Sequence, residues 1–179
     1  MRQVPNLLSI GRLLATVPMV WALSVGAREL ALGLGLLAMA SDALDGILAR
    51  HYHAESEWGR ILDPLADKVL AGAVAVTLFL HGALPLWYVL AVVGRDGAIV
   101  LGSLAMRRVL RSVPPSLPVG KLAAASVGLA LLATIAGTRG IAQNVLLALS
   151  AILLAVSLGW YAARLWRTVR LHSTKLNQS

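Results

Sequence analysis

Apolar runs of about twenty residues recur along the whole 179-residue chain, and this recurrence restricts its fold more than any other feature. A helix of that length crosses a hydrocarbon layer about 30 Å thick. Hydrophobic residues make up 58% of the chain and charged residues only 13%, about half the charged fraction of a soluble domain. The sequence therefore predicts an all-α, polytopic membrane protein with a single domain over residues 1–179.

Short turns with the sequences "GARE", "HGALP" and "GTRG" separate successive apolar runs and favour antiparallel neighbours. No small-residue cleavage site follows the first run, so we expect a retained helix rather than a removable signal peptide. The six predicted transmembrane helices are Leu7–Val25, Leu30–Ala49, Gly59–Leu80, Leu84–Met106, Pro118–Ala136 and Ile141–Trp166.

Lys and Arg are distributed unevenly between the two sides of these helices. The side with both termini carries eleven of them, and the opposite side carries only Arg28 and Arg139. The positive-inside rule then places both termini in the cytoplasm, and we expect a multi-pass protein of a bacterial plasma membrane. The net charge of +8 indicates contact with anionic lipid rather than nucleic acid. The chain has no Cys, which excludes disulfides and thiolate chemistry.

Six of the eight acidic residues lie within 26 positions, and four of these six are the aspartates Asp42, Asp45, Asp63 and Asp67. The first two are three apart and the last two are four apart, so each pair shares one face of its helix. Counting along the predicted helices places one member of each pair about 6–7 Å and the other about 12 Å from the cytoplasmic helix end. Because intramembrane charge is costly and usually functional, we prefer one shared site to solvated helix ends.

Four facing carboxylates repel one another and need cations. Ligand sets made only of oxygen favour Mg²⁺, Mn²⁺ or Ca²⁺ over zinc, and four carboxylates suit two ions. Two ions can hold the attacking and leaving oxygens of a phosphoryl displacement. Gly46, Ala49 and Gly59 leave room for a bulky ligand near the backbone, and Arg50 can bind a phosphate through two hydrogen bonds.

The spacing Asp42-x-x-Asp45-Gly46-x-x-Ala49-Arg50, then eight residues, then Gly59-x-x-x-Asp63-x-x-x-Asp67, resembles the signature of the CDP-alcohol phosphotransferase family. Every signature position is filled. The stretches "PNLLSIGRLL" and "LDPLADK" resemble the phosphatidyl-transferring branch of that family. The resemblance implies an enzyme that transfers the phosphatidyl group of CDP-diacylglycerol to an alcohol and releases CMP.

The resemblance also implies roles for single residues. Asp42, Asp45 and Asp63 would bind two Mg²⁺ or Mn²⁺ ions, and Asp67 would contact metal and act as the base. A homodimer is implied as well. The residues that would hold the CDP-lipid nucleotide are Asn6, Gly46, Ala49, Arg50 and Gly59.

Arg95 and Asp96 lie in the middle of the fourth apolar run, within "VVGRDGAIV". They form either a self-neutralising structural pair or, as we slightly prefer, part of the acceptor pocket. Phosphatidylglycerophosphate synthases and eukaryotic-type cardiolipin synthases also have Arg followed by an acid here, and "GRD" resembles the cardiolipin type more. The basic residues that follow would be plain positive-inside charge or an acceptor-phosphate site: Arg107, Arg108, Arg111 and Lys121.

Gly120-Lys121 is followed by Leu122, whereas glycerophosphate synthases often have a second Lys and a Thr there. We therefore expect a glycerol-type acceptor, with phosphatidylglycerol (giving cardiolipin) ahead of glycerol 3-phosphate. Two other classes of protein also use intramembrane carboxylates to bind metal ions, and the sequence fits both of them less well. An intramembrane prenyltransferase usually has its two aspartate motifs far apart in a longer chain, and an ion transporter would not need Gly46, Ala49, Arg50 and Gly59 at fixed offsets.

Overall fold

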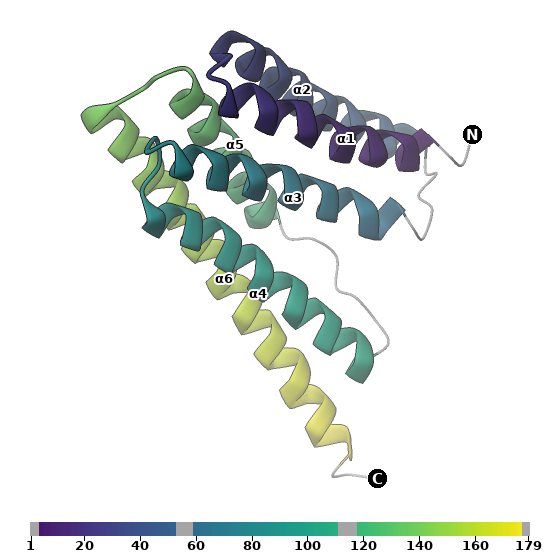
Figure 1. The fold of residues 1–179 in the computed structure, drawn as a ribbon. Coiled ribbons are helices and arrows are strands. Elements are labelled where there is room, and N and C mark those ends of the chain that lie inside the picture. Colours follow the sequence, from purple (N-terminus) through teal and green to yellow (C-terminus); the bar gives the residue numbers. More distant parts are fainter. Residues whose placement is uncertain (1–3, 53–58, 111–117, 177–179) are drawn as a thin grey trace.

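The computed structural model describes the backbone of residues 4–52, 59–110 and 118–176 (Figure 1). It describes the surroundings of side chains for residues 11, 13–41, 66–103 and 119–167. Within these residues all regular structure is helical, which confirms the predicted all-α class. The helices are α1 (Val4–Ser24), α2 (Arg28–Tyr52), α3 (Gly59–Leu80), α4 (Leu86–Leu110), α5 (Pro118–Ile135) and α6 (Gly140–Leu176).

The helix boundaries follow the predictions closely, except at the end of the chain. The start of α3 at Gly59 and of α5 at Pro118 is as predicted. Helix α6 continues ten residues beyond the predicted end at Trp166, to Leu176. Apolar and basic residues alternate at helical spacing in "ARLWRTVRLHSTK", so the same helix can leave an apolar layer and continue along a charged interface.

The three short turns share one helix-ending motif. After α1, the Gly26 N–H donates to Leu23 O and the Ala27 N–H donates to Ala22 O over 2.8 Å. This is the Schellman pattern, which needs a left-handed residue, and Gly26 has φ of 74°. The same pair of bonds recurs around Gly82 after α3 and around Gly137 after α5. Glycine therefore ends α1, α3 and α5, and the chain reverses direction after each of these helices.

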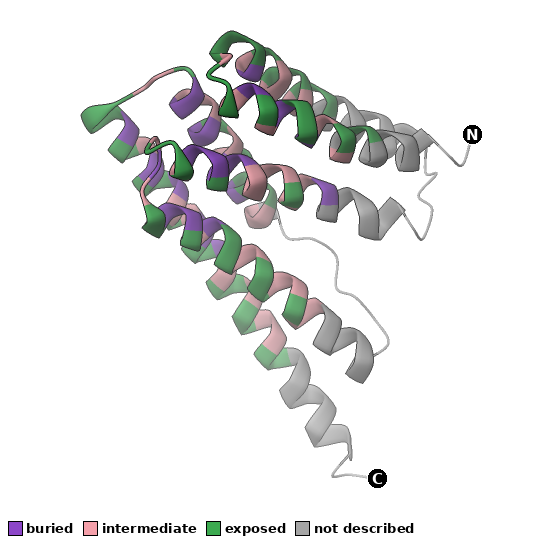
Figure 2. Cartoon of the chain, in the orientation of Figure 1, coloured by how far each residue is buried: buried purple, intermediate pink, exposed green. Residues whose placement is uncertain are grey.

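Packing within the bundle joins helices that are neighbours in sequence and also helices that are not. Helix α1 packs against both α2 and α3, α5 packs against α6, and α4 lies beside α6 (Figure 1). Buried residues line the inner faces towards the end that holds the short turns (Figure 2). The core includes the wholly buried Ala22, Ala75 and Tyr88.

The outer surface of the described residues is rich in large apolar side chains. Val17, Leu80 and Ile141 are each at least 70% exposed, and many other Leu, Val and Trp residues are half-exposed. Helices α4 and α6 contain segments long and apolar enough to cross a membrane, at Leu86–Ser103 and Gly140–Arg167. Shorter apolar stretches lie at Leu13–Ser24 in α1 and Val119–Ile135 in α5. The surface suits a lipid environment better than water.

Helices α4 and α6 run in the same direction and are joined by three polar contacts with one sequence offset. Tyr88 donates to Ser150, Arg95 donates to Ser157, and Tyr161 donates to the Ile99 carbonyl, each pair 62 residues apart. A constant offset is the mark of a parallel pair, and steps of seven and then four residues keep all three contacts on one helix face. This seam sets the register of α4 against α6.

Candidate active site

The structure brings the two aspartate pairs to the same end of the bundle. Asp42 and Asp45 belong to the last three turns of α2, and Asp63 and Asp67 belong to the first three turns of α3. These two helix ends lie on the side of the chain N-terminus (Figure 1). The side chains of Asp42, Asp45 and Asp63 lie outside the residues whose side chains are described, so their common site stays a prediction.

Helix α1 contributes more to this end than the sequence indicated. It packs against α3 and also against α2, so it links the two helices that carry the aspartates. Of the residues predicted to hold the nucleotide, Asn6 belongs to α1, Gly46, Ala49 and Arg50 belong to α2, and Gly59 is the first residue of α3. Their side chains lie outside the described set, and their roles also stay predictions.

Asp67 is the member of the four whose side chain is described. It is half-buried on α3, directly after the wholly buried Ala66. The next residue, Lys68, is half-buried too and lies within electrostatic range of Asp96 and Arg95 on α4. The predicted base therefore adjoins a residue that connects α3 to the charged cluster of α4.

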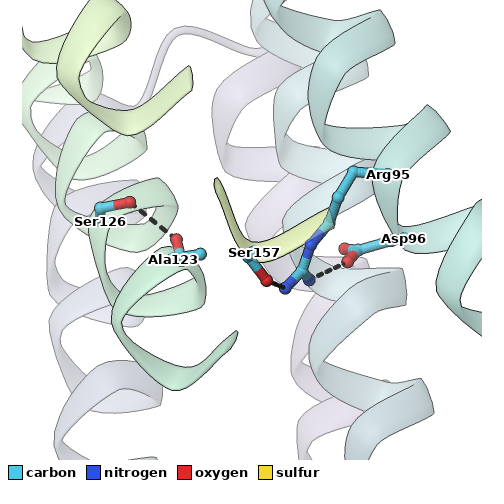
Figure 3. Close-up of polar contacts among 5 residues, drawn as sticks. All are labelled: Arg95, Asp96, Ala123, Ser126 and Ser157. Carbon is cyan, nitrogen blue, oxygen red and sulfur yellow. Dashed lines mark hydrogen bonds and ion pairs between the residues drawn. The ribbon is translucent and has the colours of Figure 1, made fainter. Parts of the chain in front are cut away.

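That cluster, which we call the Arg95 cluster, consists of Arg95, Asp96, Ser157 and Lys68. The Arg95 side chain is 9% exposed, and its Nη1 donates to Asp96 Oδ1 over 2.6 Å. Its Nη2 donates to Ser157 Oγ on α6, also over 2.6 Å (Figure 3). Among the described residues its buried Nε has no hydrogen-bond partner. Asp96 forms an ion pair with Arg95, and Lys68 adds a second cationic side chain within electrostatic range of both.

Helix α5 completes the surroundings of Arg95. A Cβ placed on Gly120 would lie 3.6 Å from Arg95 Nη2 and 3.8 Å from Ser157 Oγ, so the α5 backbone passes close to both. Gly120 is the third residue of α5, whereas Arg95 is in the middle of α4. The Arg95 cluster is therefore level with the beginning of α5, and the later turns of α4 and α6 extend beyond it (Figure 1).

The other predicted acceptor residues are only partly placed. Lys121 is exposed and follows Gly120, so it adjoins the Arg95 cluster in sequence. Arg107 and Arg108 belong to the last turn of α4, but their side chains lie outside the described set, and Arg111 lies outside the described residues altogether. The structure thus joins Arg95 to Gly120, and it leaves the loop arginines as a prediction.

Sequence reasoning missed Ser157 and Lys68 as members of this cluster. Ser157 follows Ser150 by seven residues, and both are buried, at 3% and 2% exposure. Small polar residues at heptad spacing in an apolar helix indicate contacts with a neighbouring helix, but they do not say which one. Lys68 lies within the quoted "LDPLADK", where it had no role assigned.

Helices with an apolar exterior, paired aspartates at one end and a buried cationic cluster nearby form the framework of a membrane-associated phosphoryl-transfer enzyme. Comparison with known proteins makes this specific. The family model described as CDP-alcohol phosphatidyltransferase matches residues 2–161. The chain belongs to the CDP-alcohol phosphatidyltransferase family, which confirms both the resemblance seen in the sequence and the enzyme class.

Individual relatives are named as a phosphatidylglycerophosphate synthase, a glycerol-3-phosphate phosphatidyltransferase and a cardiolipin synthase. A probable phosphatidylglycerophosphate synthase of Mycobacterium tuberculosis is 34% identical over 175 residues, covering 92% of this chain and 82% of the relative. A CDP-diacylglycerol–glycerol-3-phosphate 3-phosphatidyltransferase of Rickettsia typhi is 32% identical over 69% of this chain and 68% of its own length. A probable CMP-forming cardiolipin synthase of Drosophila melanogaster is 35% identical, over 63% of this chain and 34% of its own length.

Replacement of Asp67 by Asn tests its role as the base. Asn keeps the shape and one oxygen but cannot accept the acceptor proton, so kcat should fall about 10²-fold or more. Binding of CDP-diacylglycerol should change by less than about tenfold, or roughly 1.4 kcal/mol. Asp42→Asn should instead weaken nucleotide binding along with the rate. Calorimetry with Mg²⁺ beside a CMP-release assay measures both, and near-normal turnover of Asp67→Asn would exclude it as the base.

The Arg95 cluster allows a test that separates an acceptor pocket from a structural pair. If Arg95 contacts the acceptor, Arg95→Ala should raise the acceptor KM much more than the CDP-lipid KM. Ser157→Ala removes a partner of Arg95 without removing its charge, and it serves as the matched control. Steady-state kinetics and thermal unfolding should be measured for both. Equal losses of thermal stability with unchanged KM values would identify the cluster as structural.

Proposed function

We propose that this protein crosses the membrane six times, with both termini and the aspartates at the cytoplasmic side. The eleven-to-two distribution of Lys and Arg supports this orientation. The even number of helices and the short turns at the opposite end support it too. We further propose that the protein is a homodimer in a bacterial plasma membrane and that residues 1–179 act as one domain.

The proposed metal site is formed by Asp42, Asp45, Asp63 and Asp67, which would hold two Mg²⁺ or Mn²⁺ ions. The donor set fits these ions because it contains only carboxylate oxygens, carried by helix ends that the fold brings to one side. Bound there, such ions would neutralise the diphosphate of the CDP-lipid and stabilise the departing CMP.

The residues of the chain supply the rest of the proposed chemistry. Asn6, Gly46, Ala49, Arg50 and Gly59 hold the nucleotide. Asp67 accepts the proton of the acceptor hydroxyl. The acceptor oxygen then forms a bond to the β-phosphorus of CDP-diacylglycerol as the bond between that phosphorus and the CMP oxygen breaks. The acyl chains stay in lipid throughout, since the site lies at the cytoplasmic end of the helices.

We propose glycerol 3-phosphate as the acceptor, which makes the protein a phosphatidylglycerophosphate synthase. The observation that carries this choice is the relative of that name, which aligns over 92% of this chain. Arg95 and Lys68 support it, because two cationic side chains suit a small phosphomonoester, which brings about two negative charges. The relatives thus favour glycerol 3-phosphate over phosphatidylglycerol, the acceptor that "GRD" and the sequence after Gly120-Lys121 had favoured.

Cardiolipin synthesis remains the second candidate, supported by the "GRD" sequence and by the Drosophila relative. An acceptor screen separates the two. Purified protein receives CDP-diacylglycerol with either glycerol 3-phosphate or phosphatidylglycerol, and lipid products are identified by mass spectrometry. With glycerol 3-phosphate we expect CMP release and the product phosphatidylglycerophosphate. With phosphatidylglycerol we expect neither CMP release nor a lipid product. Formation of cardiolipin with the second would overturn the assignment.

Chelation tests the proposed metal dependence. EDTA should abolish CMP release, because four carboxylates without cations repel the diphosphate as well as one another. Mg²⁺ or Mn²⁺ added in excess should restore the activity. A parallel calorimetric titration should show that CDP-diacylglycerol binding is lost with EDTA and regained with Mg²⁺. Full activity in chelator would contradict the two-metal proposal.

A further inference from the structure

A cavity lies at the end of the bundle opposite to the aspartates. It has a volume of about 240 Å³ and is bounded by the three short turns and the helix ends beside them. Its basic lining residues are Arg28, His81 and Arg139, and apolar contacts come from Leu23, Leu78 and Ile135. No acidic residue lines it within the described part of the chain. Glu29, next to Arg28, is exposed and is not part of the lining.

The two arginines of this cavity are the two that the charge distribution assigned to this side of the membrane. Arg28 opens α2, and Arg139 precedes α6 directly, so they are far apart in the sequence. Basic residues are depleted on the non-cytoplasmic side of membrane proteins. Convergence of both such residues on one cavity therefore calls for a specific reason.

Hydrogen bonds hold Arg28 in place but use few of its donors. Its Nε donates to the carbonyl of Ile135, at the C-terminal end of α5. Its guanidinium also lies directly against Gly137, where a side chain would collide with Nη2. Within the described residues, Nη1 and Nη2 of Arg28 make no hydrogen bond. Arg28 thus closes the end of α5 and keeps two amino groups for another partner.

Arg139 is not needed to complete the fold locally. Its Nη1 donates to the Ala83 carbonyl over 3.2 Å, but that carbonyl already accepts a shorter bond of 2.7 Å from Gln143. The carbonyl is therefore satisfied without Arg139. An exposed guanidinium beside a cavity is suited to an anion, and two of them can share one phosphate.

The surroundings of the cavity indicate which anion fits. Leu80, Trp21 and Val25 are 72%, 57% and 57% exposed near the same turns, and Ile141 is 84% exposed directly after Arg139 and Gly140. Large exposed apolar side chains beside a pair of arginines match a molecule with a phosphate head and hydrocarbon chains.

We propose that Arg28 and Arg139 bind the phosphodiester of an anionic phospholipid at the membrane face opposite to the aspartates. The lipid head occupies the cavity, and its acyl chains lie along the exposed apolar side chains of the neighbouring helices. This lipid site is separate from the site of the proposed transfer reaction. The proposal rests on the proposed transmembrane arrangement and does not depend on which acceptor the enzyme uses.

Native mass spectrometry of the detergent-solubilised protein can test this proposal. Phosphatidylserine is a suitable probe because it has no free alcohol and cannot serve as an acceptor, and phosphatidylcholine is the zwitterionic comparison. Wild type should bind phosphatidylserine more tightly. Arg139→Gln should weaken that binding about fivefold, since one basic residue near a membrane surface contributes about 1 kcal/mol. Arg28→Gln combined with Arg139→Gln should weaken it about 25-fold, if the two effects add.

Glu29→Gln is the matched control, because it changes the charge by one unit at an exposed residue on the same face that does not line the cavity. It should leave phosphatidylserine binding unchanged. A gain for Glu29→Gln as large as the loss for Arg139→Gln would overturn the proposal in favour of unspecific attraction. Millimolar inorganic phosphate should not displace the lipid, and full displacement would assign the cavity to a free anion instead. CMP release by Arg139→Gln reports that the variant is folded, whichever acceptor is used.

Discussion

The buried charge of Arg95 is the constraint on which the arrangement of α4, α5 and α6 depends. A guanidinium at 9% exposure in an apolar bundle is tolerated only with partners close at hand. Asp96 supplies the opposite charge from the same helix, and Ser157 supplies a hydroxyl from α6. Ser157 can do so only if α4 and α6 run in parallel at an offset of 62 residues, the register that Tyr88 and Ser150 also fix. Gly120 then allows α5 to pass close to both.

The two ends of the bundle use charge in different ways. At the turn end, Schellman bonds satisfy carbonyls of α1, α3 and α5, and Arg28 donates to the last carbonyl of α5. Gln143 and Arg139 both donate to the Ala83 carbonyl, and Gln143 makes the shorter bond. At the other end lie the ends of α2 and α3 that carry the aspartates, and the charge of Lys68 connects α3 to the Arg95 cluster. The two ends thus differ in charge: the described turns carry arginines, and the opposite end carries the predicted aspartate site.

Much of the helical framework could be predicted because its causes are local. Apolar runs and the glycines at 26, 82 and 137 determined where helices end, within a few residues. The aspartate spacing identified the family, as the comparison confirmed. The pairing of α4 with α6 could not be predicted, because the heptad spacing of Ser150 and Ser157 shows a contacting face without naming its partner. The packing of α1 against α3 was not predicted either, because sequence spacing does not name the partner of a helix beyond its neighbours along the chain.

The depth of Arg95 illustrates how packing changes the meaning of a sequence position. From the sequence, Arg95 lies in the middle of an apolar run, and its predicted role is either a structural pair with Asp96 or, as slightly preferred, part of the acceptor pocket. In the structure it is level with the third residue of α5, since that helix begins where α4 is only half complete. Lys68, one residue beyond Asp67, lies within electrostatic range of it. In the proposed reaction the acceptor hydroxyl reaches Asp67, so a phosphate on the same small molecule would bring negative charge towards Lys68 and Arg95. The proposed glycerol 3-phosphate is such an acceptor, because one molecule offers a hydroxyl to the proposed base and a phosphomonoester to the two cationic side chains.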